Sequence, residues 1–186
     1  LSTYTLSSKL NKKFINNDLN VDANLGIDHY NSNYRAIGNN WAGTPYNNIA
    51  SQKIVEPFAL IKFSNTTNSN IEYEAGFRQH YYDLDADNYT NKSSLLSRVR
   101  QNYAWSLGFN YILDNNRNFF GHISRSFRSP RLDEIISLVS PNPTSTDIKH
   151  QYSHDIEIGH KIKSNDSNYN VALYRSLIKN QIVYNS

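Results

Sequence analysis

Apolar and polar residues alternate along most of this chain, in one segment after another. Between residues 19 and 30 one parity reads Leu19, Val21, Ala23, Leu25 and Ile27, and the other reads Asn20, Asp22, Asn24, Gly26 and Asp28. The same pattern recurs at 71–82, 101–113 and 149–162. A period of two residues predicts β-strands with one apolar and one polar face. Long strands of this kind favour a barrel that stands in a membrane and encloses water.

The alternation predicts eight strands, at 2–7, 19–30, 54–63, 71–82, 101–113, 119–128, 148–162 and 169–178. The first connection, 8–18, is intermediate in length, and after it short connections (64–70, 114–118 and 163–168) alternate with long ones (31–53, 83–100 and 129–147). We therefore expect all the long loops at one end of the sheet, which is typical of outer-membrane barrels. A soluble sandwich also alternates its faces, but nothing requires it to sort loops by length.

The composition is polar, yet it is compatible with a membrane location. Hydrophobic residues make up 38% of the 186 residues, and the mean hydropathy is −0.66. No stretch approaches the roughly 20 apolar residues of a membrane helix, but a membrane strand needs an apolar residue only at every second position. Tyr73, Tyr81, Tyr103 and Tyr111 lie near strand ends on the apolar parity, which predicts an aromatic girdle; alternatively, Tyr is simply a good strand former.

Composition and motifs give little support to other kinds of chemistry. The chain has no Cys, which excludes disulfides and Cys-type metal sites, and its net charge of +3 gives no strong reason to expect nucleic acid. It contains no Gly-x-Ser-x-Gly elbow, no His-Glu-x-x-His zinc motif and no glycine-rich phosphate loop. We therefore expect no catalytic residues, no metal site and no cofactor.

Gly26, Gly76, Gly108 and Gly159 each interrupt a predicted strand on its polar parity. A glycine inside a strand marks a bend, a bulge or the close approach of other groups. If these glycines face inward, they leave room for something packed in the lumen; the alternative is a bulge with no partner.

Both ends of the chain read like interrupted strands, and no signal peptide precedes the first one. We interpret residues 1–186 as a fragment. Eight strands could close into a small barrel, but we expect an open piece of a larger wall, whose unpaired edges favour aggregation when it is isolated.

Several motifs resemble TonB-dependent outer-membrane receptors. Residues 71–82, Ile-Glu-Tyr-Glu-Ala-Gly-Phe-Arg-Gln-His-Tyr-Tyr, are similar to the family's strand ending in Gly-Leu-Arg-Tyr, and 56–63 resembles the strand before it. Residues 105–134 are the most specific, because they run from Trp-Ser-Leu-Gly-Phe-Asn-Tyr through a short turn into Phe-Arg-Ser-Pro-Arg-Leu-Asp-Glu. Residues 155–161 and 169–181 resemble the strands that follow. One departure is His150-Gln151, where the family often has Pro-Glu.

The resemblance implies an all-β fold, a transmembrane antiparallel β-barrel of which residues 1–186 form a partial wall of about eight strands. Family members enclose an N-terminal plug in a 22-stranded barrel, and the plug contacts TonB. The implied function is a non-enzymatic receptor in the bacterial outer membrane that imports a ferric siderophore or similar bulky nutrient. Its partners would be that nutrient, the TonB complex through the plug, and outer-membrane lipid. Alternatives are a passive porin, a receptor for haem or another nutrient, a barrel phospholipase, and a soluble carbohydrate-binding sandwich.

The candidate ligand-binding residues gather where strands enter the long connections. Arg78, His80 and Tyr82 share the polar parity of their strand, and Arg128 and Arg131 flank a proline, with Glu134 beyond them and His150 before the next strand. Arginine pairs with carboxylates in bidentate geometry, so such forks suit an anionic iron chelate or a haem propionate. Alternatively, Arg78 and Arg128 pair with acidic residues of the plug or the wall and hold the lumen together.

Haem is the less favoured ligand. Haem receptors of the family place a ligating His between a Phe-Arg-Ala-Pro box and an Asn-Pro-Asn-Leu box. Here Phe-Arg-Ser-Pro at 127–130 and Ser-Pro-Asn-Pro at 140–143 have no His between them, and His150 follows instead.

Overall fold

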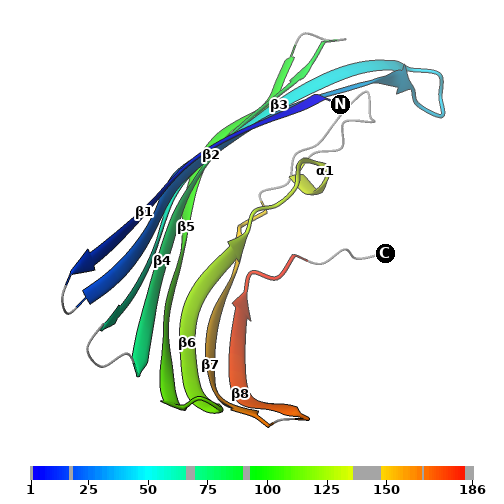
Figure 1. Ribbon diagram of the computed structural model, residues 1–186. Helices are drawn as coiled ribbons and strands as arrows, with labels where there is room; N and C mark the ends of the chain where they lie inside the picture. Colours follow the sequence, from blue (N-terminus) through cyan, green and yellow to red (C-terminus); the bar gives the residue numbers. More distant parts are fainter. Residues whose placement is uncertain are drawn as a thin grey trace.

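The computed structural model describes residues 2–16, 19–65, 70–89, 93–135, 148–164 and 166–182. These residues form eight strands and one short helix: β1 Ser2–Asn16, β2 Leu19–Asn39, β3 Pro45–Asn65, β4 Ile71–Asn88, β5 Ser93–Asp114, β6 Arg117–Arg128, α1 Leu132–Ile135, β7 Gln151–Lys163 and β8 Asn168–Lys179. The strands make one antiparallel sheet in sequence order, with β1 and β8 at its edges. Figure 1 shows a curved wall with α1 on its concave side. The predicted fold, a partial wall of eight antiparallel strands, is confirmed.

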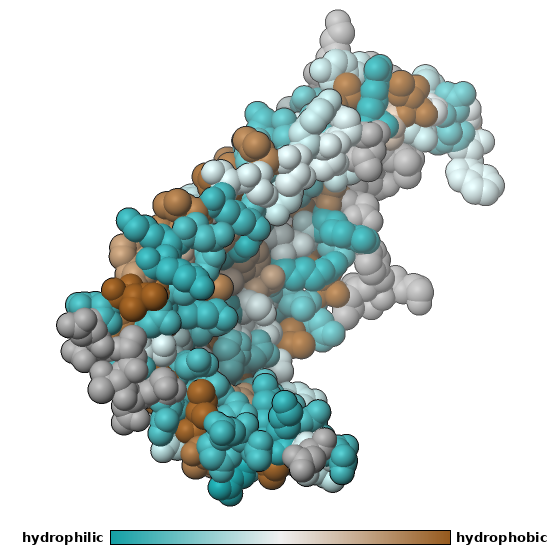
Figure 2. Space-filling model, viewed as in Figure 1, coloured by the Kyte–Doolittle hydropathy of each residue, from teal (hydrophilic) through white to brown (hydrophobic). Residues whose placement is uncertain are grey.

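The two parities of each strand lie on opposite faces of this wall. Asp28, Glu56 and Arg78 lie on the concave face, hereafter the inner face, which is the face that α1 covers. Large apolar side chains such as Leu25, Phe77 and Leu107 lie on the convex face, hereafter the outer face, and remain exposed. Figure 2 shows apolar residues along the convex upper-left edge and polar residues over the adjoining surface.

The exposed outer face excludes the sandwich alternative. A second sheet would bury Leu107, Phe109, Ile156 and Ile158, but these side chains are 53%, 39%, 53% and 56% exposed. The described residues instead contain a single sheet and only a small buried cluster around α1. No helix in this part of the chain is long and apolar enough to cross a bilayer.

Aromatic side chains form two groups on the outer face. Phe63 and Tyr73 stack near the short-turn end with ring centroids 5.0 Å apart, and Phe77 and Tyr103 stack nearer the other end at 6.5 Å. Tyr73 and Tyr81 are eight residues apart, as are Tyr103 and Tyr111, which gives about 27 Å along a strand and about 21 Å across a bilayer at a tilt of about 40°. This height fits an aromatic girdle at both interfaces, and that role stays a prediction.

The strands are longer than the sequence predicted at the end with the long connections. We expected loops at 31–53 and 83–100, but β2 and β3 remain paired to Asn39 and Pro45, and β4 and β5 to Asn88 and Ser93. The prediction was wrong because the alternation fades where both faces meet water, while the backbone ladder continues. Asn40 closes the first hairpin, since its Oδ1 accepts the N–H groups of Ala42 and Thr44 at 3.0 and 2.8 Å.

Two further boundaries differ from the prediction. At the short-connection end β1 runs on to Asn16, nine residues past the predicted end at residue 7. At the long-connection end β7 begins at Gln151, three residues later than predicted. The third long connection contains α1, and its residues 136–147 lie outside the described part of the chain. The predicted alternation of short and long connections is therefore wrong for the first two long ones, because residues 40–44 and 89–92 suffice to join β2 to β3 and β4 to β5, whereas the connection 129–150 remains long.

Two of the four inward glycines make room for a phenylalanine of the neighbouring strand. A Cβ at Gly26 would overlap the ring of Phe58, and a Cβ at Gly159 would overlap the ring of Phe120. Each ring belongs to the residue directly paired with that glycine across the sheet. The pairing is regular at these positions, so the bulge alternative does not apply to them. Neighbouring aromatic rings, which also pin the register, fill the space.

An introduced lysine should destabilise the folded protein more on the outer face than on the inner face. Leu107 lies midway between Tyr103 and Tyr111 on the outer face, so Leu107→Lys places a charge near the centre of the bilayer and should cost about 2–4 kcal/mol. Ser124→Lys on the inner face is the matched control and should cost less than about 1 kcal/mol. The folded fraction of the full-length protein in lipid vesicles, read from heat-modifiable migration on gels, measures both. Equal losses would contradict the assignment of the faces.

The glycine–aromatic pairs predict a second contrast. A Cβ at Gly121 meets only the ring of its paired Phe109, whereas one at Gly108 has ordinary contacts at 3.5 and 3.6 Å. Gly121→Ala should therefore cost about 1–3 kcal/mol through overpacking, while Gly108→Ala should be neutral or stabilise by up to about 1 kcal/mol. Urea unfolding of the full-length protein measures both changes. A Phe109→Leu substitution should restore most of the Gly121→Ala loss, and failure to do so would count against the ring as its cause.

Candidate functional site

A charged cluster lies on the inner face, near the middle of β2, β3 and β4. Arg78 Nη1 of β4 contacts Glu56 Oε2 of β3 at 2.6 Å and Asp28 Oδ2 of β2 at 3.2 Å. Ser7 Oγ of β1 donates to the other Asp28 oxygen at 2.7 Å. The Arg78 guanidinium also lies 4.9 Å from the centre of the Phe58 ring. These contacts fix Arg78 to three neighbouring groups of the wall.

His80 connects this cluster to the segment that follows β6. Its Nδ1 lies 2.7 Å from Glu56 Oε1, and its Nε2 lies 2.9 Å from the Ser129 hydroxyl. Ser129 Oγ is in turn 3.0 Å from Nδ1 of His150, which directly precedes β7. With both imidazoles neutral, His80 Nδ1–H donates to the carboxylate, its Nε2 accepts from the hydroxyl, and the hydroxyl oxygen accepts from His150 Nδ1–H.

Glu56, His80 and Ser129 follow the order of groups in a serine hydrolase triad, but other features of a hydrolase are missing. The Ser129 oxygen is occupied by His150, and His80 is only 4% exposed. The residue after Ser129 is Pro130, which has no backbone N–H to stabilise an oxyanion. The arrangement is suited to holding the chain segments together.

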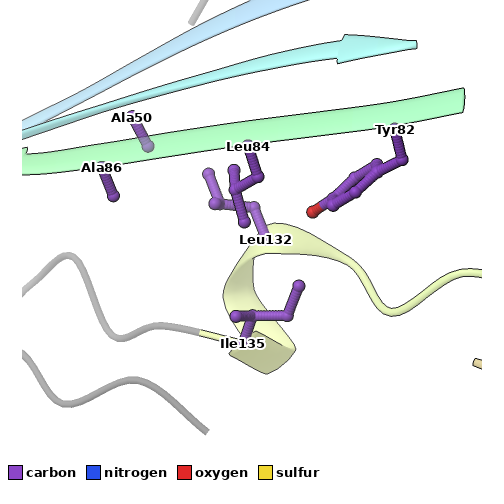
Figure 3. Close-up of a cluster of buried hydrophobic side chains, with 6 residues drawn as sticks. All are labelled: Ala50, Tyr82, Leu84, Ala86, Leu132 and Ile135. Atoms are coloured by element: carbon purple, nitrogen blue, oxygen red, sulfur yellow. The ribbon is translucent and has the colours of Figure 1, made fainter. Parts of the chain in front are cut away.

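The segment after β6 packs on the inner face through a small apolar cluster. Figure 3 shows Leu132 and Ile135 of α1 beneath β4, where they lie against Tyr82, Leu84 and Ala86, with Ala50 of β3 close by. All six side chains are at most 5% exposed. Burial of a leucine or isoleucine side chain is worth about 1.5–3 kcal/mol, so these two residues supply most of the attraction.

Glu134 turns the same segment toward Arg128. The Arg128 guanidinium forms an ion pair with Glu134 Oε1, and the backbone N–H of Arg131 donates to Oε2 at 2.7 Å. Burial acts to raise the pKa of Glu134, but the Arg131 N–H and the Arg128 charge outweigh it and hold that pKa below its usual range. Glu134 is therefore a carboxylate at neutral pH. The Arg128 side chain stays 41% exposed.

The structure brings the seven predicted residues into one region, but in different situations. Arg78, Arg128 and Arg131 retain access to solvent. His80, Tyr82 and Glu134 are buried beneath or within residues 129–135, hereafter the returning segment. The Tyr82 hydroxyl has no hydrogen-bond partner among the described residues. Arg78 pairs with two carboxylates of the wall, as in the alternative, whereas Arg128 pairs with Glu134 of α1. Whether the seven residues bind ligand stays a prediction.

Sequence reasoning missed three members of this region: Asp28, Glu56 and Ser129. Asp28 lies on the polar parity of its strand, whereas Glu56 shares its parity with Ile54, Phe58 and Leu60. The two carboxylates are direct cross-strand partners, and only the register shows that they meet Arg78. Ser129 belonged to the Phe-Arg-Ser-Pro motif, yet nothing in the motif indicates that its hydroxyl reaches two histidines.

The region that comprises the charged cluster, the adjoining part of β5 and the segment after β6 carries a net positive charge. Five arginines, Arg78, Arg98, Arg100, Arg128 and Arg131, lie on or above this part of the inner face, against the three carboxylates Asp28, Glu56 and Glu134. The excess of two positive charges favours an anion in the enclosed space. Among the described residues no group of three or more His, Asp or Glu side chains is arranged to hold a metal ion.

Comparisons with known proteins agree with this architecture. The family model described as "TonB dependent receptor-like, beta-barrel" matches residues 2–186. The search of curated proteins gives no match.

Solved structures of iron receptors share the fold at low sequence identity. The closed form of the ferric-catecholate import receptor Fiu from E. coli K12 is 16% identical, with a TM-score of 0.67 over 98% of this chain and 32% of that one. The unliganded ferric citrate transporter FecA is 10% identical, with a TM-score of 0.74 over 95% of this chain and 27% of that one. The ferric yersiniabactin uptake receptor FyuA from Yersinia pestis is 9% identical, with a TM-score of 0.63 over 95% and 28%.

The chain thus spans about a third or less of the length of these structures. The family consists of transport receptors of the bacterial outer membrane, not of enzymes. This chain belongs to the TonB-dependent receptor-like β-barrel family, and it forms part of the wall of such a barrel.

Proposed function

We propose that this wall belongs to a receptor that imports a ferric siderophore or a similar anionic iron chelate, with energy supplied through TonB. The observation that carries the proposal is the excess of arginine on the inner face, at the end where the long connections meet. An anionic chelate that enters from outside would reach these charges first. The solved structures with the same fold include receptors named for ferric catecholate, ferric citrate and ferric yersiniabactin, which supports iron chelates as the class of cargo.

Within this proposal the seven residues divide into two roles. Arg78, Arg128 and Arg131 are open to solvent, and we assign them direct contact with the chelate through charge-assisted hydrogen bonds. Tyr82 and Glu134 are buried, and we assign them the support of the returning segment. His80 and His150 connect that segment to the wall. A haem receptor is the second candidate within the family, because His150 Nε2 has no partner among the described residues.

The arginine assignment predicts a loss of chelate affinity. Arg131→Gln in the full-length receptor should weaken binding of ferric catecholate or ferric citrate by roughly 10- to 100-fold, since one hydrogen bond to a charged group is worth about 1.5–3 kcal/mol. Arg128→Lys, which keeps the charge but loses the fork, should have a smaller effect in the same direction. Quenching of tryptophan fluorescence on titration with each chelate measures the affinity.

Arg117 supplies the matched control for these variants. It lies at the opposite end of the wall, in the turn between β5 and β6, where it pairs with Asp114 at 2.6 Å. Arg117→Gln should leave chelate affinity unchanged. If it weakened binding as much as Arg131→Gln does, the effect would reflect overall charge and the assignment would fail.

The energy source is tested by uptake in cells. Import of radiolabelled iron through the full-length receptor should disappear in a strain that lacks TonB, because transport against a gradient needs energy that the outer membrane does not hold. Restoring TonB from a plasmid should restore import. Undiminished import without TonB would favour the porin alternative, and haem binding abolished by His150→Ala would favour haem as the cargo.

A further inference from the structure

The Ser129 hydroxyl joins two histidines, one in β4 and one directly before β7. It lies 2.9 Å from His80 Nε2 of β4 and 3.0 Å from His150 Nδ1, three chain segments meeting at one oxygen. The two imidazole rings are perpendicular, with centroids 6.3 Å apart. We call this group of Ser129, His80 and His150 the clasp.

The His80 side of the clasp is fixed to the wall. His80 is buried, its Nδ1 is held by Glu56 at 2.7 Å, and Glu56 is held in turn by Arg78 at 2.6 Å. The Phe127 ring lies against the same imidazole, with ring centroids 4.9 Å apart. Because Glu56 holds one nitrogen of the His80 imidazole and Phe127 packs on the ring, the imidazole loses little further conformational entropy when it contacts Ser129. The contact is therefore pre-organised.

The other side of the clasp is the returning segment. It also attaches through Leu132 and Ile135 on the apolar cluster. Two residues before His150, the Ile148 carbonyl accepts a hydrogen bond from Arg100 of β5 at 2.9 Å. Ser129 stands directly after Arg128 and two residues before Arg131. The clasp therefore fixes the residues that lead to Arg131, whereas Arg128 is held by its pairing with Gln151 of β7.

Protonation of His150 opposes the clasp. Its Nδ1 is used by Ser129, so an added proton goes to Nε2, which is buried and has no hydrogen-bond partner among the described residues. The charged and titratable groups next to it are Arg100 from β5 and His80 from β4, and Glu56 from β3 contacts the other nitrogen of His80. Glu56 and Glu134 form their hydrogen bonds with Arg78, His80, Arg128 and Arg131, and not with His150.

We propose that the clasp is a proton-sensitive device in which Ser129 is a positioning residue: it holds residues 129–135 against β4 at neutral pH and releases them in acid. Because Arg131 lies on this segment and Arg128 pairs with its Glu134, release weakens capture of the chelate, a consequence that rests on the proposed function.

The direction of the pH effect follows from His150. Burial, with the Arg100 charge and the neighbouring His80 adding to it, lowers the pKa of His150 from 6.5 to about 4. The closed state therefore binds fewer protons than the open one, and the clasp is fully stable above about pH 6.5 and loses stability as the pH falls toward 4. The two pKa values set an upper bound of about 300-fold on the change in the closed-to-open ratio, and solvent screening of this half-buried ring lowers the expected change to about 10- to 100-fold.

Thiol labelling of the ligand-free, full-length receptor tests the clasp. In a cysteine-free background, Ile135→Cys places a thiol at a site that is 2% exposed, and Ser126→Cys places a reference thiol at an exposed one. The ratio of their maleimide labelling rates cancels the pH dependence of the reagent. We expect protection at position 135 to fall about 10- to 100-fold between pH 7 and pH 4.5. Leu132→Cys is a second probe on the same cluster, and the two probes should agree.

Variants of the clasp decide the outcome. Ser129→Ala should reduce protection about tenfold at pH 7, and His150→Gln, which does not titrate, should remove the pH dependence. His154→Gln is the matched control, because His154 is exposed on the outer face of β7, and it should leave both properties unchanged. Full protection in Ser129→Ala, or an unaltered pH profile in His150→Gln, would overturn the proposal. If Ser129→Ala does not fold, the His150→Gln profile alone decides.

Chelate titrations of the same variants separate the two proposals. Release of the segment together with a roughly tenfold loss of affinity supports both the clasp and its link to the ligand site. Release with unchanged affinity upholds the clasp and refutes the position of Arg131 in the ligand site.

Discussion

The backbone hydrogen-bond ladder is the constraint on which the rest of this structure depends. In hydrocarbon an unpaired N–H or C=O group costs several kcal/mol, so a strand can cross a membrane only with a neighbour on each side. Seven successive antiparallel pairings meet this demand everywhere between β1 and β8 along the lower part of the wall. Once the ladder fixes the backbone, side chains alternate between lipid and water, and each face can be chosen for its own solvent. This is why a chain with a polar composition forms a membrane wall.

The candidate site lies where that ladder opens. Pairing between β5 and β6 stops at Trp105 and Arg125, while β5 continues along β4 up to Ser93. Side chains replace the missing backbone partners: the Arg125 guanidinium donates to the Tyr103 carbonyl, and Arg100 reaches the Ile148 carbonyl. The returning segment with α1 occupies the inner face beside this opening. A region that must satisfy its polar groups through side chains collects arginines, and one of them, Arg100, also contributes to the positive inner face.

Much of the fold could be predicted from the sequence, because lipid imposes a strict period of two. The parity of residues 101–113 identified Leu107 and Phe109 as outward and Asn102 as inward, and the structure agrees. At 31–53 water lies on both sides of the sheet, so the period of two is lost and did not predict that the hairpin continues. The partners of the site were hidden for another reason. Glu56 meets Arg78 and His80 only through the register of β3 and β4, and Ser129 reaches His80 across 49 residues of sequence. Neither relation leaves a local pattern.

An arginine that already pairs with carboxylates can still recognise an anion. Both bonds of Arg78 to Asp28 and Glu56 leave from Nη1, so Nε and Nη2 have no hydrogen-bond partner among the described residues. A guanidinium has five donors, and two acidic acceptors leave most of them available. The same carboxylates hold the group in place against Phe58, so an incoming ligand does not have to order a flexible side chain. The pairing lowers the net charge that attracts the anion from a distance, and in exchange it fixes the donors that bind the anion on arrival.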